Sequence, residues 1–206
     1  MPWPVPVTIK LVKMDQQKQI RKWLISELGM SSSERIFSAQ EKIFHECVSS
    51  LTGKTPNQMK TLTGTILPRV ALYKAFQDDA EYAPRAYDLV RKYMIEVIGR
   101  QKHQSTAFLD KIPGFYKIYS RTFLKIMRTT DLQVSTQYEG KDYYDITITD
   151  CLWHNACVEF GCPELCVCFC EVDDITYGGL KHLGFTRTKT LGTGGDCCDF
   201  HFFRKS

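Results

Sequence analysis

The side chains best suited to chemistry are cysteines, and they are concentrated in the last quarter of the chain. The sequence contains nine cysteines, and only Cys47 lies far from this quarter. The other eight are Cys151, Cys157, Cys162, Cys166, Cys168, Cys170, Cys197 and Cys198. A thiol can act as a nucleophile or as a metal ligand, and its surroundings decide which. We therefore expect the chemistry of this protein to lie in residues 150–203.

Cys151 has the sequence setting of a reactive thiol. Residues 150–160 have the pattern of a short helix, which Thr149 or Asp150 can cap. Cys151 would then lie in the first turn, where unpaired N–H groups and the helix dipole favour a thiolate. His154 would share its helical face and could act as a base. The alternative is a small core cysteine beside a hydrogen-bonded histidine.

A second group of cysteines lies in an apolar run. We predict a buried strand over residues 165–172, on which Cys166, Cys168 and Cys170 would point to one face. Three aligned thiols suggest a metal, but structural zinc sites usually contain paired C-x2-C knuckles, and none is present. The spacing favours the alternative, in which these thiols are buried as small hydrophobic side chains. We therefore expect no metal and no cofactor.

Two aspartates follow this run. Asp173 or Asp174 is expected to cap a short helix over residues 174–182. The other carboxylate would then be free to lie beside a thiol and act as a general base. The sequence leaves the structural and the functional interpretation open, and Asp173 is our candidate for the catalytic role.

A glycine-rich turn over residues 192–195 precedes the last predicted strand, 197–203. Its N–H groups, around Thr190, Gly194 and Gly195, could bind a substrate carboxylate, and Arg187 is the nearest candidate cation. The alternative is an ordinary hairpin turn, since the stretch lacks the G-K-[ST] of a phosphate loop. On the strand, Cys198 would share a face with the phenylalanines at 200 and 202.

The first 128 residues have helical periodicity, so we expect helices from this half of the chain to pack against the cysteine-rich region and position its residues. Apolar side chains recur at helical spacing over 15–28, 34–51, 57–76, 84–100 and 107–127, with disturbances expected near Pro68 and Pro113. The period then changes to two, which predicts a β-hairpin over 132–138 and 143–148. A further strand is predicted over 185–191.

These elements predict an α+β protein. Its N-terminal helical half is followed by an antiparallel or mixed sheet with short inserted helices. We expect a helical region, residues 1–128, and a cysteine-rich α/β region, residues 129–206, to form one domain.

Composition narrows the class of protein. The formal net charge is only +4, without a dense basic block, which argues against a nucleic-acid partner. Four basic residues at helical spacing are expected to form a solvated helix face: Lys117, Arg121, Lys125 and Arg128. No apolar run is long enough to span a membrane, and the proline-rich residues 1–6 do not resemble a signal peptide but an extended segment laid over the surface. We therefore expect a cytosolic protein with reduced thiols that binds a small molecule, and leave a homo-oligomer open.

In several of the segments described above, and in one helical segment, the chain resembles the L-2-amino-thiazoline-4-carboxylic acid hydrolase family. The similarity begins in residues 67–76, Leu-Pro-Arg-Val-Ala-Leu-Tyr-Lys-Ala-Phe, and continues with Cys151. Residues 161–165, Gly-Cys-Pro-Glu-Leu, and 170–173, Cys-Glu-Val-Asp, resemble two further family elements. The closing element is the most specific, with Thr-Leu at 190–191, the glycine turn and Cys-Asp-Phe at 198–200.

The resemblance implies a hydrolase that adds water to a cyclic amidine and opens its ring. Cys151, Cys170 and Cys198 match the family's cysteines and Asp173 its acidic residue. A cysteine would attack the amidine carbon, or Asp173 would activate water directly, and the resemblance leaves this choice open. Two other classes also remain: a zinc or iron–sulfur protein, and a small-molecule sensor that binds without turnover.

Overall fold

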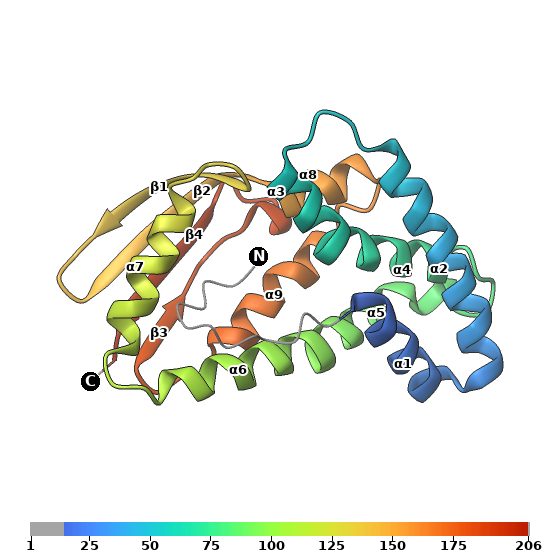
Figure 1. Cartoon of the computed structure of the whole chain (residues 1–206), viewed down its shortest axis with the longest axis horizontal. Coiled ribbons are helices and arrows are strands. Elements are labelled where there is room, and N and C mark those ends of the chain that lie inside the picture. Colours follow the sequence, from blue (N-terminus) through green and yellow to red (C-terminus); the bar gives the residue numbers. More distant parts are fainter. Residues whose placement is uncertain (1–14, 206) are drawn as a thin grey trace.

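The computed structural model describes residues 15–205, in which helices pack beside a four-stranded sheet (Figure 1). The α-helices are α1 (Gln16–Leu28), α2 (Met30–Ser50), α3 (Pro56–Thr61), α4 (Leu67–Gln77), α5 (Ala86–Tyr93), α6 (Arg100–Asp110), α7 (Phe115–Met127), α8 (Leu152–Glu159) and α9 (Leu165–Tyr177). Shorter helical segments are η1 (Leu62–Ile66), η2 (Ala83–Arg85), η3 (Met94–Gly99) and η4 (Leu191–Thr193). The predicted extended segment 1–6 lies outside the described residues.

The sheet is antiparallel throughout the described residues. Its strands are β1 (Gln133–Glu139), β2 (Tyr143–Cys151), β3 (Leu183–Thr186) and β4 (Cys198–Arg204), in the order β1-β2-β4-β3. The α+β prediction is therefore confirmed, as is the hairpin of β1 and β2. Helix α7 lies over one face of this sheet, and α9 runs between the sheet and the other helices (Figure 1).

The five predicted helical segments are all helical, although their boundaries differ. Helix α2 begins at Met30, directly after Gly29, whose positive φ of 76° ends α1 and reverses the chain. The helix therefore begins four residues before the predicted 34, and Ser33 lies inside it, where its hydroxyl donates to the Met30 carbonyl. The disturbance expected near Pro68 is the π-helical segment η1, which precedes a proline that has no N–H to donate.

The alternation predicted for the last strand agrees with the structure. Cys198, Phe200 and Phe202 are buried, whereas the side chains between them are partly exposed. Phe202 stacks on Tyr144 of β2 with ring centroids 5.0 Å apart, and it also contacts Tyr177 of α9. This aromatic packing joins the sheet to α9.

Residues 165–182 correct the sequence prediction. The predicted strand 165–172 and helix 174–182 are replaced by one helix, α9, which continues to Tyr177. Residues 165–170 are all apolar, so alternation could not distinguish strand from helix. Neither Asp173 nor Asp174 is a helix cap, because both lie inside α9. Of the three cysteines predicted to share one strand face, Cys166 and Cys170 still share a face one helical turn apart, whereas Cys168 lies on another side of the helix.

The strand predicted over 185–191 is also shorter in the structure. β3 ends at Thr186, and the N–H groups of Thr188 and Lys189 donate to the Asp199 carboxylate, at 2.9 and 2.8 Å. A side chain of the neighbouring strand therefore replaces the carbonyl partner that a sheet ladder would supply. The chain is thereby redirected toward η4 and the glycine turn.

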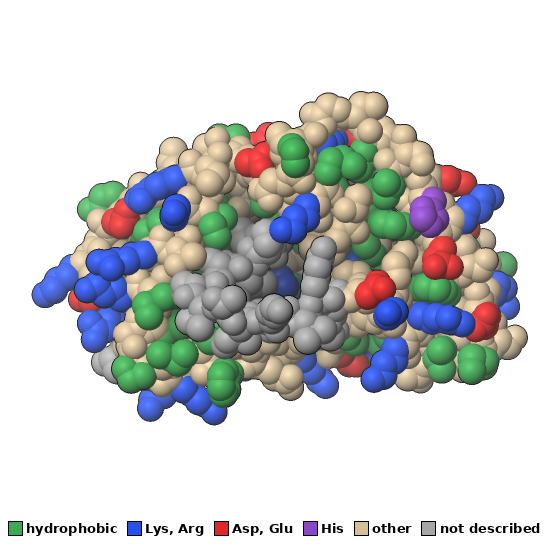
Figure 2. Space-filling model, in the orientation of Figure 1, with side chains coloured by type: hydrophobic (Ala, Val, Ile, Leu, Met, Phe, Trp, Pro, Cys, Tyr) green, Lys and Arg blue, Asp and Glu red, His purple; other side chains and the backbone are tan. Residues whose placement is uncertain are grey.

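The basic residues of α7 lie where a solvated helix face was predicted. Lys117, Arg121, Lys125 and Arg128 are all exposed. Figure 2 shows basic side chains at the end of the molecule where α7 and the sheet lie, with acidic side chains among them. Within residues 15–205, no helix combines the length and the apolar character needed to cross a bilayer.

Asp110 connects the helical layer to the segment that leads into β3. Its side chain is 2% exposed, and its Oδ2 accepts from the backbone N–H groups of Lys181 and His182, at 2.6 and 2.9 Å. We predict that Asp110→Ala lowers the free energy of unfolding by about 1–3 kcal/mol per N–H left unsatisfied. Urea denaturation measures the effect, and Asp88→Ala, at an exposed site, is the control. An unchanged midpoint for Asp110→Ala would contradict this role.

Candidate functional site

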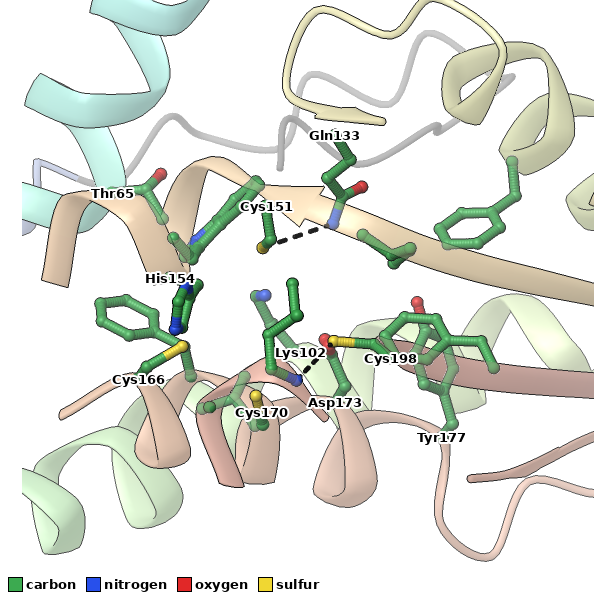
Figure 3. A pocket seen from close by; sticks show the side chains of 18 of the residues that line it. Thr65, Lys102, Gln133, Cys151, His154, Cys166, Cys170, Asp173, Tyr177 and Cys198 are labelled. Carbon is green, nitrogen blue, oxygen red and sulfur yellow. Dashed lines mark hydrogen bonds between the residues drawn. The ribbon is translucent and has the colours of Figure 1, made fainter. Parts of the chain in front are cut away.

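One pocket opens between α9, the start of α8, β4, α6 and the η1–α4 segment (Figure 3). It encloses about 810 Å³ of space free of protein atoms, including the space at its open mouth. Five of the predicted site residues line it: Cys151, His154, Cys170, Asp173 and Cys198. These side chains are up to 47 positions apart in the sequence, so the fold alone brings them together.

Cys151 lies at the junction of β2 and α8. It is the last residue of β2 and also the N-cap of α8, so the predicted caps Thr149 and Asp150 are wrong. They belong to β2, whose pairing with β1 continues to Cys151. The Cys151 thiol accepts from Gln133 Nε2 at 3.9 Å. Burial raises its pKa to about 12, although backbone N–H groups at the start of α8 act in the opposite direction.

Cys166 and Cys170 lie one turn apart on α9 and form a thiol cluster with Cys157 of α8. Hydrogen bonding with the Cys157 and Cys170 thiols lowers the pKa of Cys166. The positive charge of Arg187 acts in the same direction. Cys166 also lies in the first turn of α9, where the helix dipole favours an anion. Cys166 is therefore the pocket thiol best prepared to exist as a thiolate.

Cys170 and Cys198, which also line the pocket, have raised pKa values, in contrast to Cys166. The pKa of Cys170 is raised, first because it donates to Cys166 and then because it is buried. Burial also raises the pKa of Cys198, although its sulfur accepts from the Leu191 N–H at 3.3 Å. Both groups therefore favour the neutral thiol in the absence of a ligand.

Asp173 and Lys102 form the charged centre of the pocket. They come from α9 and α6 and face each other (Figure 3). Burial raises the pKa of Asp173, and the positive charges of Lys102 and Arg187 partly offset this. Burial lowers the pKa of Lys102 to about 8, against the attraction of Asp173. Both shifts bring the pKa values of the two groups closer to neutral pH, where a group can both accept and donate a proton during catalysis.

Arg187 is not part of the pocket wall, contrary to the prediction that it binds substrate. Its guanidinium pairs with Asp174 at 2.6 Å and lies 5.8 Å from the ring centres of Phe185 and Phe200. The arginine thus lies behind the wall formed by Phe200. From there it acts on Cys166 and Asp173 by its electric field, without direct contact with the pocket.

The predicted anion site of the glycine turn is also not available. The N–H of Gly194 donates to the Leu191 carbonyl and that of Gly195 to the Thr190 carbonyl, at 3.2 and 2.9 Å. Thr190 is buried, caps η4 and hydrogen-bonds to the Cys170 sulfur. None of the three lines the pocket.

Gly192 is the glycine of this turn that reaches the pocket. A Cβ atom at this position would lie 3.0 Å from Cys166 Sγ and 3.3 Å from the Cys166 carbonyl carbon. The absence of a side chain therefore permits the turn to pack closely against the start of α9.

Three residues of the site were not predicted from the sequence: Arg69, Lys102 and Cys166. All three line the pocket. Arg69 lies inside the segment that resembles the family, and its position among apolar residues was the available signal. Lys102 lies on α6 within an ordinary polar stretch, and no local pattern distinguishes it. Cys166 was assigned to a strand, which hid its place at the start of a helix.

A metal centre receives no support from the arrangement of donors. All nine cysteines are free, and no group of three or more His, Cys, Asp or Glu side chains within residues 15–205 is arranged to hold a metal ion. The thiols hydrogen-bond to one another.

Comparison with known proteins bears on the same region. A family model described as L-2-amino-thiazoline-4-carboxylic acid hydrolase matches residues 59–202. This segment contains every described residue that lines the pocket. No curated protein and no solved structure matches the chain significantly.

Proposed function

Since the chain belongs to the L-2-amino-thiazoline-4-carboxylic acid hydrolase family, we propose that its pocket adds water to a small cyclic amidine and opens the ring at a C–N bond. The observation that carries this proposal is the joint presence of thiols, a carboxylate and an ammonium group on one pocket wall. Cys166, Asp173 and Lys102 supply a nucleophile, a base and an acid within the same hollow.

The amidine carbon is the electrophile, and its reactivity increases when the amidine nitrogens are protonated. The Asp173 carboxylate can pair with this cation and hold the ring. Cys166 Sγ then forms a bond to the amidine carbon, and the C=N π electrons move to the ring nitrogen. Lys102 donates a proton to that nitrogen, after which the C–N ring bond breaks.

Water completes the reaction. Asp173 accepts a proton from a water molecule, which attacks the same carbon, and the Cys166 thiolate leaves. The net change is the gain of one water by the substrate and a ring-opened carbamoyl product. Cys151 and Cys198 supply neutral thiols that shape the wall, since both have raised pKa values.

A direct attack by water is the alternative within the same function. Asp173 would then activate water without a covalent intermediate, and the thiols would only shape the pocket. The two routes differ in one measurable way, because only the covalent route adds the ring to the mass of the protein.

The test is incubation with a panel of cyclic amidines, lactams and hydantoin-like rings, including 2-amino-thiazoline-4-carboxylate. Mass spectrometry is expected to record a gain of one water in an amidine, and prior treatment with iodoacetamide is expected to abolish it. Binding of a ring without any conversion would instead identify a sensor. Conversion that survives complete alkylation of Cys166 would favour direct attack by water.

A further inference from the structure

Arg69 is a buried cation that faces the pocket without a counter-charge among the described residues. It lies on α4, is 4% exposed and lines the pocket wall. One of its terminal nitrogens donates to the neutral Gln16 side chain at 2.9 Å. Its Nε is buried without a hydrogen-bond partner, and no carboxylate within residues 15–205 acts on its pKa.

Such a group is costly to maintain. Burial of an unpaired charge lowers stability unless a partner repays the loss of hydration. Burial already lowers the pKa of Arg69, but a guanidinium remains charged at neutral pH. The contact of the guanidinium with the Phe169 ring, 5.7 Å from its centre, offsets only part of the cost. The missing partner is therefore expected to be a ligand.

The charges around the pocket indicate the charge of that ligand. Arg69 and Lys102 are the cations of the described wall, and Asp173 is its only carboxylate. Asp173 acts on the pKa of Lys102, whereas neither Asp173 nor Cys166 acts on the pKa of Arg69. A negatively charged group of the ligand would balance the Arg69 charge, and a planar carboxylate fits the fork of a guanidinium.

We propose that Arg69 is the residue of this pocket that binds the carboxylate of the substrate, so that the acid group of the ring lies at the α4 side. This inference deepens the proposed function, on which it depends for the nature of the ring. Trp153 and Phe169, both on the wall, provide apolar surface for the flat body of the ring. Lys102 and Asp173 then remain available to the amidine.

The experiment uses two stable aromatic rings that resemble the proposed substrates but are not expected to be opened by the protein. They are 2-aminothiazole-4-carboxylate and its uncharged 4-carboxamide, and isothermal titration calorimetry measures their dissociation constants. The wild-type protein is expected to bind the carboxylate about 10- to 100-fold more tightly than the carboxamide, as expected for a buried hydrogen bond between charged groups. Arg69→Met is expected to abolish this preference, whereas Arg69→Lys retains part of it.

Thermal unfolding separates a binding role from a structural one. Arg69→Met removes an uncompensated buried charge while keeping an apolar stem, so its melting temperature is expected to equal or exceed that of the wild type. The control is Arg85→Gln, an exposed arginine of η2 that does not line the pocket, and this variant should keep the preference.

Three results would overturn the inference: no binding of either ring, equal binding of both by the wild type, or a preference that persists in Arg69→Met. A marked loss of stability in Arg69→Met, with the carboxylate preference kept in Arg69→Lys at the wild-type value, would assign a structural role instead. Failure of the hydrolase proposal would give a different result: the carboxylate preference would still depend on Arg69, but the protein would convert no ring.

Discussion

Asp173→Asn is expected to lower kcat/KM for ring opening by about 10²- to 10⁴-fold, the range of a single oriented acid or base. Asparagine preserves the size of the side chain but removes the negative charge that pairs with an amidinium and accepts a proton from water. The loss should appear in kcat as well as KM, because the proton transfer belongs to the chemical step. Steady-state kinetics with the best substrate of the panel measures it.

The pH profile gives a second measurement of the same pair. Burial raises the pKa of Asp173, so its carboxylate is lost as the pH falls through a value above the usual range for aspartate. Burial lowers the pKa of Lys102 to about 8, so its proton is lost as the pH rises through about 8. The wild type is therefore expected to have a bell-shaped profile, and Asp173→Asn should remove the acid limb.

Asp174 provides the control for this prediction. It is the next residue of α9, but it is exposed and pairs with Arg187 outside the pocket. Asp174→Asn should change kcat/KM little. If Asp173→Asn keeps full turnover, or if both variants lose the same activity, Asp173 is not the base.

Cys166→Ala is expected to cause a loss of kcat at least as large as that of Asp173→Asn, because the attacking sulfur forms the bond that activates the ring. The corresponding alanine variants of Cys151, Cys170 and Cys198 should retain more activity, since their thiols are predominantly protonated. Full retention of turnover in all four variants would exclude covalent catalysis and leave Asp173 to activate water.

Alkylation tests the state of Cys166 without any substrate. Only the thiolate reacts rapidly, so a thiol with a lowered pKa keeps its reactivity as the pH falls, whereas an ordinary thiol slows about tenfold per pH unit. Iodoacetamide at pH 6, followed by peptide mass spectrometry, should label Cys166 before the other pocket cysteines. Cys157→Ala removes one of the two hydrogen bonds to the Cys166 sulfur and should slow this labelling. Equal and slow labelling of every pocket thiol would contradict the assignment.

Arg187 illustrates how a site can depend on a residue that does not touch its ligand. From the sequence, Arg187 is predicted to bind the substrate because it is a cation near the glycine turn. In the structure it lies behind Phe200 and pairs with Asp174. Its charge still acts on Cys166 and Asp173, both of which favour their anionic forms because of it. Arg187 therefore lowers the pKa values of Cys166 and Asp173 from outside the pocket, whereas Arg69 and Lys102 line the pocket itself.

Local periodicity was sufficient to predict most of the fold. The five helical segments, the hairpin of β1 and β2 and the buried face of β4 follow from the alternation of apolar and polar residues along the chain. Such patterns survive without knowledge of neighbours, because one side of each element faces the core and the other faces water. Residues 165–170 are all apolar and have no such contrast, so their helical state depended on packing between the sheet and the helices.

The candidate site divides in the same way. The sequence by itself predicted a site at Cys151, Cys170, Asp173 and Cys198, because their order resembles that of the family, and all four side chains line the pocket. Only the tertiary structure added Lys102 and Arg69 from distant helices, surrounded Cys166 with groups that lower its pKa, and placed Arg187 behind the wall. The physical reason is that charge pairing, burial and hydrogen bonding act between atoms close in space, and no spacing along a chain records those distances.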